Sequence, residues 1–238
     1  MTGSERELVE HENRDGVHVL CLCRPPVNAF DRHLVMSFLE ALRAARADPE
    51  CAAIVVTGIP GIFCAGIDIR ETPAYSRLER ADMLRTINRM CCQLYGMPKP
   101  VVAAITGHAL GGGLVIALAC DLRLAARGAF KLGLTEAEAG IAFPAGPLAI
   151  VHGELSPHVI RDLTLRARTA APDDPAMANI IDRIVDPDAL LDEAVREAHT
   201  LAALPGYQEI KAQVRAPVIE RLRHIVKEDD EPLLRGWI

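Results

Sequence analysis

The segment GHALGGGLVIALACD, residues 107–121, places three consecutive glycines directly before an apolar run. Glycine loses more conformational freedom on folding than any other residue, so three in succession need a structural reason. The preceding segment, PKPVVAAITG at 98–107, has the composition of a buried strand, and 113–121 has the length of a buried helix. We therefore expect a strand, a tight glycine turn and a helix whose first turn is approached closely by another group.

The pattern alone leaves three interpretations of this turn open. The first is close packing of the helix against the strand. The second is a dinucleotide-binding turn, although the spacing is GxxxGxG instead of GxGxxG and no acidic residue ends a second strand about 20 residues later. The third is an anion site, in which free N–H groups at the helix start hold the oxyanion of a thioester or ester carbonyl. A P-loop is excluded because no Gly-Lys-Ser/Thr sequence follows.

The rest of the chain alternates short apolar runs with longer amphipathic segments, which predicts an α/β fold with a parallel or mixed sheet covered by helices. Asp31 suits the N-cap of one helix, Gly96 marks the end of another, and Pro157 suits a first helical turn. The expected strands start near residue 18 and cover 51–57, 101–106 and 122–126. The expected helices cover 31–48, 77–97, 145–155 and 157–170, followed by a helical region from 187 to about 227 that is divided at Pro205-Gly206.

The composition excludes several classes of function. The net charge is −6 and the basic residues are scattered, which argues against binding to nucleic acid. The seven cysteines form no matched CxxC pairs and the N-terminus has no apolar signal segment, so we expect reduced thiols in a cytoplasmic protein. No apolar run approaches the roughly 20 residues that a membrane span needs, and no residue set has metal-ligand spacing.

A second glycine turn, FCAGID at 63–68, also follows an apolar strand and offers a second N–H donor. With both turns present, the chain resembles the crotonase (enoyl-CoA hydratase/isomerase) superfamily over residues 18–190. The resemblance implies a crotonase-like spiral of ββα units around a parallel sheet and the binding of an acyl-CoA thioester. The matching segments are RPPVNAFD at 24–31, FCAGIDIRE at 63–71, KPVVAAITGHALGGGLVIALACDLRLAA at 99–126, GLTEAEAGI at 133–141 and MANIIDRIV at 177–185.

The resemblance also implies how the chain is organised. We predict a crotonase-like acyl-CoA-binding core over residues 1–187 and a C-terminal helical trimerisation region over 188–238. The boundary lies where apolar strands give way to helices alone. A homotrimer or hexamer is expected, with an acyl-CoA as the partner and no cofactor besides the coenzyme A of the substrate.

Carried over residue by residue, the resemblance implies that the N–H groups of Ile67 and Gly112 stabilise the oxyanion. These residues are distant in the sequence, so only the fold can bring them together. Asp68 has an alternative interpretation as the N-cap of the turn at 69–71. The predicted substrate-binding positions are Asn28, Ala29, Ala65, Asp68, Gly111 and Val115.

An oxyanion hole stabilises an enolate but moves no proton, so a carboxylate is needed near the reacting carbon. Hydratases of this superfamily carry two glutamates, and the corresponding positions here are Val115 and Glu136. Glu136 is therefore the predicted catalytic base, with Glu138 as the alternative if the loop aligns differently. Burial would raise the pKa of Glu136 and helix ends would lower it, so the sequence does not give the sign of the shift.

A single glutamate in an apolar pocket suits a proton shuttle between C2 and C4 of a 3-enoyl-CoA. In this respect the chain resembles the Δ3,Δ2-enoyl-CoA isomerase branch, and the expected activity moves the double bond from position 3 to position 2. The alternatives are a hydratase, a thioester hydrolase or a decarboxylase on the same scaffold, a non-catalytic crotonase-like subunit, and, more distantly, a nicotinamide oxidoreductase.

Overall fold

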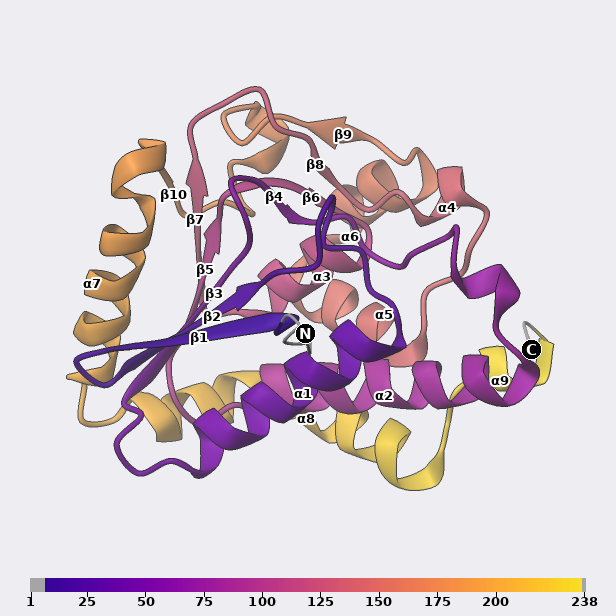
Figure 1. Cartoon of the computed structure of the whole chain (residues 1–238), viewed down its shortest axis with the longest axis horizontal. Coiled ribbons are helices and arrows are strands. Elements are labelled where there is room, and N and C mark those ends of the chain that lie inside the picture. The colour runs from indigo at the N-terminus through magenta and orange to yellow at the C-terminus, as the bar shows by residue number, and fades with distance from the viewer. Residues whose placement is uncertain (1–6, 237–238) are drawn as a thin grey trace, which may run out of the picture.

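A six-stranded sheet spans the molecule in the computed structural model, which describes residues 7–236 (Figure 1). Its order is β1-β2-β3-β5-β7-β10, and all its neighbouring pairs are parallel except the hairpin of β1 and β2. The N-terminal hairpin was not expected, because β1 is polar and mostly exposed. The strands are β1 (Val9–Arg14), β2 (Val17–Leu22), β3 (Ala53–Thr57), β5 (Val101–Ile105), β7 (Leu122–Ala126) and β10 (Arg183–Val185).

A second, four-stranded sheet has the order β4-β6-β8-β9. Along the chain, β3, β5 and β7 each continue into a strand of this second sheet and then into a helix. This repeat is the predicted spiral of ββα units, and it confirms the expected crotonase-like α/β fold. The strands are β4 (Gly61–Cys64), β6 (Gly107–Leu110), β8 (Leu132–Gly133) and β9 (Thr169–Ala170).

Helices cover both faces of the six-stranded sheet. On one face α7 packs against alternate apolar residues of the strands, among them Val17, Val55 and Val102. The other face carries the main core, to which α1, α2, α3 and α5 contribute. The longer helices are α1 (Arg32–Ala47), α2 (Arg77–Tyr95), α3 (Gly112–Ala119), α5 (Ala145–Glu154), α7 (Leu190–Ala202) and α8 (Tyr207–Glu228).

Local capping residues explain several of the helix boundaries. The Asp31 carboxylate accepts a hydrogen bond from the backbone N–H of Leu34 at 2.7 Å and starts α1 as predicted. Ser76 and Glu79 form a capping box at the start of α2, and Gly96 ends that helix. The helix expected over 157–170 is shorter in the structure, where the helical residues end at 165. The remaining elements are α4 (Glu136–Ala139), α6 (Pro157–Ile160), α9 (Leu233–Gly236), the π-helical turn at 161–165 and short 3₁₀ turns at 72–74, 175–177 and 187–189.

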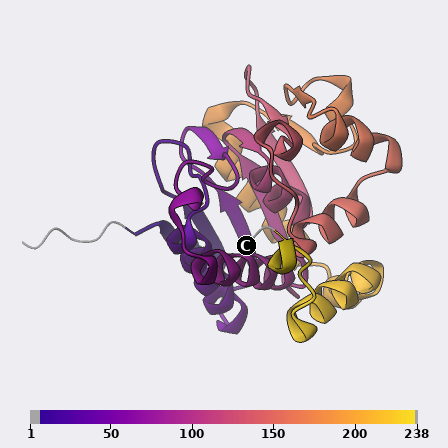
Figure 2. The ribbon, with the colours of Figure 1, turned by 90° about the vertical axis from the view of Figure 1, so that its right-hand side faces the viewer.

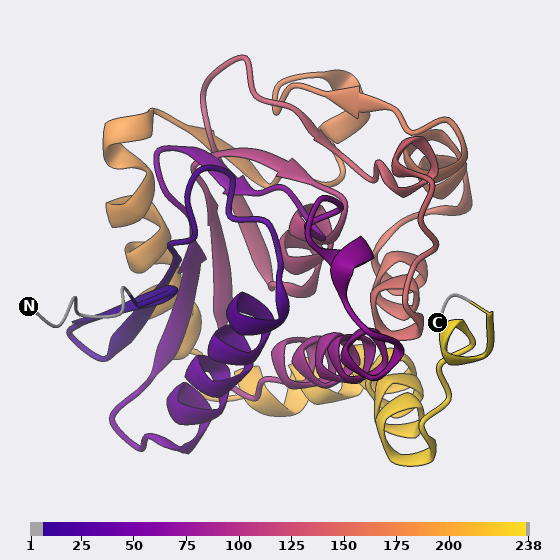
Figure 3. The ribbon, with the colours of Figure 1, turned by 45° about the vertical axis from the view of Figure 1, so that its right-hand side comes forward.

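The helix that follows the glycine run lies in the middle of the molecule, between the second sheet and the outer helices (Figure 3). Residues 114–119 are each at most 1% exposed. A helix that is apolar on all sides must lie inside the protein. The glycine turn at the start of α3 is therefore held in place from every side.

The C-terminal helices pack on the same core. Figure 2 shows α8 beside α2 and α5. Lys211 donates to the Asp121 carboxylate at 2.6 Å, and Arg215 donates to the Ala119 and Cys120 carbonyls at 2.9 Å. These carbonyls end α3 and have no partners within it, so α8 satisfies them. The region boundary at 187 stays a prediction, and residues 1–6 and 237–238 lie outside the described residues.

Candidate active site

A cavity of about 490 Å³ opens where the loops after β2, β4, β6 and β8 meet. The strands β4, β6 and β8 are parallel neighbours, so their carboxyl ends lie at one edge of the second sheet. This is the edge at which α/β sheets bind ligands. The wall consists of residues 24–27, Ala29, Phe30, 65–70, Ile87, Met90, Cys91, 110–112, Val115, Ile116, Thr135, Glu136, Ala139, Ile141, Ala142, Pro144 and Pro147.

The backbone N–H of Ile67 faces this cavity because Phe30 occupies the other side of the segment. Phe30 donates its N–H to the Gly66 carbonyl at 2.7 Å and accepts from the Asp68 N–H at 3.0 Å. Successive peptide groups of an extended segment point to opposite sides. The N–H of Ile67 therefore points away from Phe30, and no acceptor within residues 7–236 takes it.

The loop of Ile67 and the start of α3 are in close contact. A Cβ atom at Gly66 would lie 2.8 Å from the Leu110 carbonyl oxygen and 2.9 Å from the Gly112 nitrogen, so no side chain fits there. The N–H of Gly112 is in the first turn of α3, where the helix offers no internal acceptor. Ile67 and Gly112, from distant segments, thus line the same cavity, and within residues 7–236 no acceptor takes the N–H of either residue. An oxyanion site requires two free donors of this kind.

Each glycine of the run has its own structural reason. Gly111 has φ +52° and ψ −125°, a backbone conformation that side chains rarely permit. A Cβ atom at Gly113 would lie 2.1 Å from the Cys64 carbonyl oxygen, so this glycine allows α3 to pack on β4. At Gly112 an added Cβ would lie 3.6 Å from the Gly66 Cα and 3.7 Å from the Phe30 ring, which are ordinary contact distances, so packing alone does not require a glycine there. Close packing and an open N–H therefore coexist in the same turn.

Glu136 is the first residue of α4 and lies beside this turn. Its Oε1 would be 3.2 Å from a Cβ atom placed on Gly111. The side chain is only 6% exposed, and its Oε2 has no hydrogen-bond partner in the described part of the chain. Burial raises the pKa of Glu136 to about 7, although its own backbone N–H lowers it slightly. The carboxyl group is therefore able to take up and release a proton near neutral pH.

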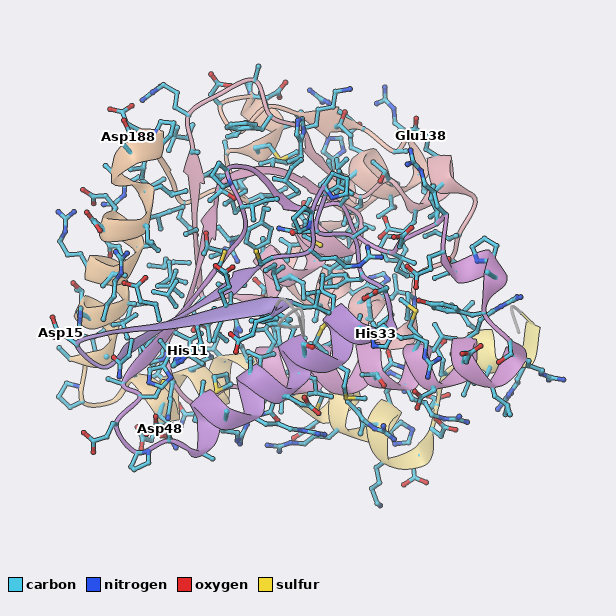
Figure 4. The ribbon with its side chains drawn as sticks, viewed as in Figure 1. His11, Asp15, His33, Asp48, Glu138 and Asp188 are labelled. Atoms are coloured by element: carbon cyan, nitrogen blue, oxygen red, sulfur yellow. The ribbon has the colours of Figure 1, made fainter. Side chains whose placement is uncertain are left out.

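Glu138, the alternative base, occupies a different environment. It is exposed and lies at the periphery of the molecule (Figure 4), and it does not line the cavity. One helical turn is 3.6 residues, so two residues along α4 a side chain points to nearly the opposite face. The geometry therefore favours Glu136 as the proton-transfer group.

The buried carboxyl of Glu136 predicts a specific pH dependence of stability. In the unfolded chain Glu136 ionises near pH 4.5, but in the folded protein it ionises near pH 7. The folded state therefore binds more protons, and the free energy of unfolding falls as pH rises through this window, by about 3 kcal/mol for this group. Relative to Glu136→Gln, the native protein should lose this amount between pH 4 and pH 8 in urea titrations. Parallel stability curves for the two proteins would contradict the burial of this carboxyl.

Val115 lies one turn into α3 and contributes an apolar surface to the cavity. It is 1% exposed, and its hydrocarbon side chain offers no hydrogen-bonding group at this position of the wall. Within residues 7–236, the carboxylates that line the cavity are Asp68 and Glu136. The Asp68 carboxylate is already engaged with Arg24 at 2.9 Å. Glu136 is thus the carboxyl group available for proton transfer.

Asp68 combines its two sequence interpretations. Its Oδ1 accepts from the N–H groups of Arg70 and Glu71 at 3.1 and 3.2 Å, as a turn cap does, and its side chain also lines the cavity. Burial by itself would raise the pKa of Asp68, but the hydrogen bonds from Arg24 and the backbone outweigh it and lower the pKa. Asp68 is therefore ionised and fixed at neutral pH.

Asn28 is the predicted binding residue that the structure places behind the cavity wall. Its side chain is fully buried, donates to the Leu22 and Phe63 carbonyls at 2.8 and 3.1 Å, and accepts from the Arg24 N–H at 2.8 Å. These hydrogen bonds are all with backbone groups of the protein. The Asn28 side chain therefore fixes the shape of the loop and does not line the cavity. The other eight predicted site residues all line the cavity, and their roles stay predictions.

Several residues of the site carry no signal in the sequence. Arg24 lies at the cavity wall and binds three carboxylates, those of Asp31, Asp68 and Glu71, at 2.7–3.0 Å. Phe30 fixes the direction of the Ile67 N–H. Neither residue shows a local sequence signal of its role, because the partners are 36 residues or more away for Phe30 and 44 or more for two of the carboxylates that bind Arg24.

A model of the enoyl-CoA hydratase/isomerase family matches residues 12–232. The chain belongs to this family. The match covers both glycine turns, Glu136 and most of the C-terminal helical region. It therefore includes every residue discussed above as part of the cavity.

Several curated proteins of the enoyl-CoA hydratase/isomerase family are similar in sequence. Human mitochondrial methylglutaconyl-CoA hydratase is 32% identical over 196 residues, which are 82% of this chain and 57% of that protein. A probable enoyl-CoA hydratase of Mycobacterium tuberculosis is 32% identical, over 79% of this chain and 75% of that protein. This chain spans 57–62% of the length of the mammalian methylglutaconyl-CoA hydratases that it matches.

Solved structures of family members have the same fold. Human mitochondrial Δ3,Δ2-enoyl-CoA isomerase superposes with a TM-score of 0.85 at 25% identity, covering 93% of this chain and 88% of that one. An enoyl-CoA isomerase of Mycobacterium tuberculosis superposes with a TM-score of 0.83 at 26% identity, covering 93% and 96%. Hydratases and isomerases therefore share this fold, and the site must distinguish them.

Two other kinds of site are absent from residues 7–236. Within this range no helix has the length and apolar character needed to cross a membrane. The same range holds no group of three or more His, Cys, Asp or Glu side chains arranged to bind a metal ion.

Proposed function

We propose that the protein isomerises an enoyl-CoA thioester, moving the double bond from position 3 to position 2. The ionised Glu136 removes a proton from C2, and the electrons pass to the thioester oxygen, forming a dienolate. The N–H groups of Ile67 and Gly112 stabilise that oxygen. Glu136 then returns the proton to C4, the C2–C3 bond becomes double, and the carbonyl re-forms. The carboxylate is regenerated, so the step needs no cofactor.

The observation that carries this proposal is the pairing of a buried, unpartnered Glu136 with an apolar Val115. Water addition across a double bond benefits from two groups that hold and activate the water. Here one of the two positions is a hydrocarbon, and the remaining carboxyl has a pKa of about 7. Such a group suits both the removal and the return of one proton.

The second candidate function is hydration of a 2-enoyl-CoA, because curated relatives at 32% identity are named as hydratases or probable hydratases. The two reactions have different products. Incubation with 3-enoyl-CoA should give 2-enoyl-CoA, detected by mass and ultraviolet absorbance, with little 3-hydroxyacyl-CoA. Rapid formation of 3-hydroxyacyl-CoA from 2-enoyl-CoA would show that one glutamate suffices for hydration here and would refute the isomerase proposal.

The pH dependence of isomerisation follows from the pKa of Glu136. Removal of the C2 proton needs the ionised carboxylate, and the pKa of about 7 leaves this form in the minority below neutrality. We expect kcat/KM to rise by about tenfold per pH unit below pH 7 and to level off above it. Isomerisation rates at saturating and at limiting 3-enoyl-CoA, from pH 5 to pH 9, give kcat and kcat/KM at each pH. A profile that stays flat from pH 5 to pH 7 would contradict Glu136 as the base.

Val115→Glu tests the isomerase proposal by changing the apolar position of the cavity wall. The variant would place a second carboxylate at the wall that is now apolar. Since this carboxylate has no prepared partner, we expect a loss of stability of about 1–3 kcal/mol. We also expect slower isomerisation, measured beside Val115→Leu as an apolar control. Unchanged isomerisation in Val115→Glu would show that this wall does not face the substrate.

We further propose that the protein works as a homotrimer or hexamer in the cytoplasm. The exposed apolar side chains of Ile210 and Val214 on α8 support an association through the C-terminal region. The absence of a disulfide within residues 7–236 supports a reducing compartment. Sedimentation equilibrium of the native protein tests the oligomeric state.

A further inference from the structure

After α8 the chain turns back, and Glu231 enters the interior beside the start of α5. Its side chain is 3% exposed. Oε2 accepts a hydrogen bond from Asn88 Nδ2 at 2.9 Å and another from the N–H of Ala145 at 2.8 Å, while Oε1 accepts from the N–H of Leu233 at 3.0 Å. Asn88 in turn accepts from the N–H of Gly146 at 2.8 Å. We call Glu231 and Asn88 the tail clamp.

The tail clamp joins three parts of the chain. Ala145 and Gly146 are the first residues of α5, whose N–H groups have no partners inside the helix. Asn88 belongs to α2, and Glu231 to the C-terminal segment. In the described part of the chain, the donors to Glu231 are uncharged amides, so the start of α5 supplies the favourable field for a buried carboxylate. Removing Glu231 would leave these donors buried and unpaired.

The tail clamp stands directly behind the apolar end of the cavity. Three residues of α2 near Asn88 line the cavity: Ile87, Met90 and Cys91. Pro144, the N-cap of α5, and Pro147 within α5 line it as well. The five side chains that line this end of the cavity are apolar or a thiol, so this end suits the hydrocarbon part of an acyl group. The clamp sets the distance between the two helices that form this wall.

A second groove lies on the other side of the same wall. It is lined by apolar residues of α5, α8 and α9, among them Leu148, Val218 and Leu233, and also by Ala145 and Glu231. The start of α5 and Glu231 therefore separate the two spaces. If the start of α5 moved away from α2, the cavity would lengthen toward this groove.

We propose that the tail clamp is a specificity determinant that limits the length of the acyl chain the cavity accepts. This inference rests on the proposed acyl-CoA function of the cavity. Glu231 and Asn88 do not touch the reacting atoms, so they act as positioning residues. Loss of the clamp should release the start of α5 and favour long acyl chains over short ones.

The test measures dissociation constants of saturated butanoyl-, octanoyl- and dodecanoyl-CoA by calorimetry, together with isomerisation of matching 3-enoyl-CoAs. In Glu231→Ala the affinity ratio of dodecanoyl- to butanoyl-CoA should rise about tenfold, since a mismatch of one methylene already changes binding by that order. In Glu231→Gln the ratio of the two affinities should stay close to the native value, because one amide oxygen can accept from both Asn88 and Ala145. Asn88→Ala should shift the ratio in the same direction as Glu231→Ala.

Asp229→Asn is the matched control, because Asp229 lies in the same segment and binds the same helix through Arg85 at 2.8 Å without touching α5. Its chain-length ratio should equal that of the native protein. An unchanged ratio in folded Glu231→Ala and Asn88→Ala would overturn the inference, and so would failure of both to fold, which would assign the clamp to stability alone. Failure of the native protein to bind or isomerise any acyl-CoA would refute the proposed function instead.

Discussion

Glu136→Gln is expected to reduce kcat for double-bond migration by about 10²–10⁴-fold, the usual contribution of a positioned general base. Glutamine has nearly the same shape but cannot accept the proton from C2. The side chain is buried and its Oε2 is unpartnered, so the amide replaces it without breaking an ion pair. The affinity for a saturated acyl-CoA should stay within a few-fold of the native value. Steady-state rates with 3-enoyl-CoA and calorimetry with a saturated analogue measure the two quantities.

Glu138→Gln is the matched control for this prediction. Glu138 belongs to the same short helix, α4, but is exposed and outside the cavity wall. We expect its kcat and KM to match those of the native protein. Full turnover by Glu136→Gln together with loss of turnover in Glu138→Gln would mean that the assignment of the base is wrong.

Gly112→Val is expected to lower kcat/KM by about 10²–10³-fold, because the added side chain blocks access to one oxyanion donor, whose loss costs about this much. The added Cβ would lie 3.6 Å from the Gly66 Cα and 3.7 Å from the Phe30 ring, which are ordinary contact distances. The protein should therefore fold, while the branched side chain fills the space that the thioester oxygen must enter. Both turnover and acyl-CoA binding should decline, because the blocked space is used in both.

Gly206→Val serves as the control for the added side chain. Gly206 precedes α8, has φ −98°, and an added Cβ there would meet no atom within 4 Å. Its melting temperature and kcat/KM should resemble those of the native protein. A folded Gly112→Val protein with native turnover would rule out the N–H of Gly112 as an oxyanion donor.

Local sequence patterns were sufficient to predict most of the elements near the site. Three of the expected strands, at 51–57, 101–106 and 122–126, correspond to β3, β5 and β7. The Asp31 N-cap, the end of α2 at Gly96 and the break between α7 and α8 depend on residues close in the chain, so the sequence reveals them. The hairpin strand β1 was missed because its side chains are polar, and the helix at 157–170 was overextended because a π-helical turn ends it at Leu165.

The sequence by itself determined that a glycine turn precedes a buried helix, that a second turn follows another strand, and which family these segments resemble. The tertiary structure decided which groups meet. Packing of Gly66 on Gly112 brings two N–H donors together across 45 residues of chain, and burial selects Glu136 over Glu138. Contacts between distant segments also decided the place of Asn28, which donates to the Phe63 carbonyl in the core, and of Glu231, whose donor Asn88 lies 143 residues away. Side-chain direction, burial and contacts between distant segments are properties of the packed chain, so local patterns do not contain them.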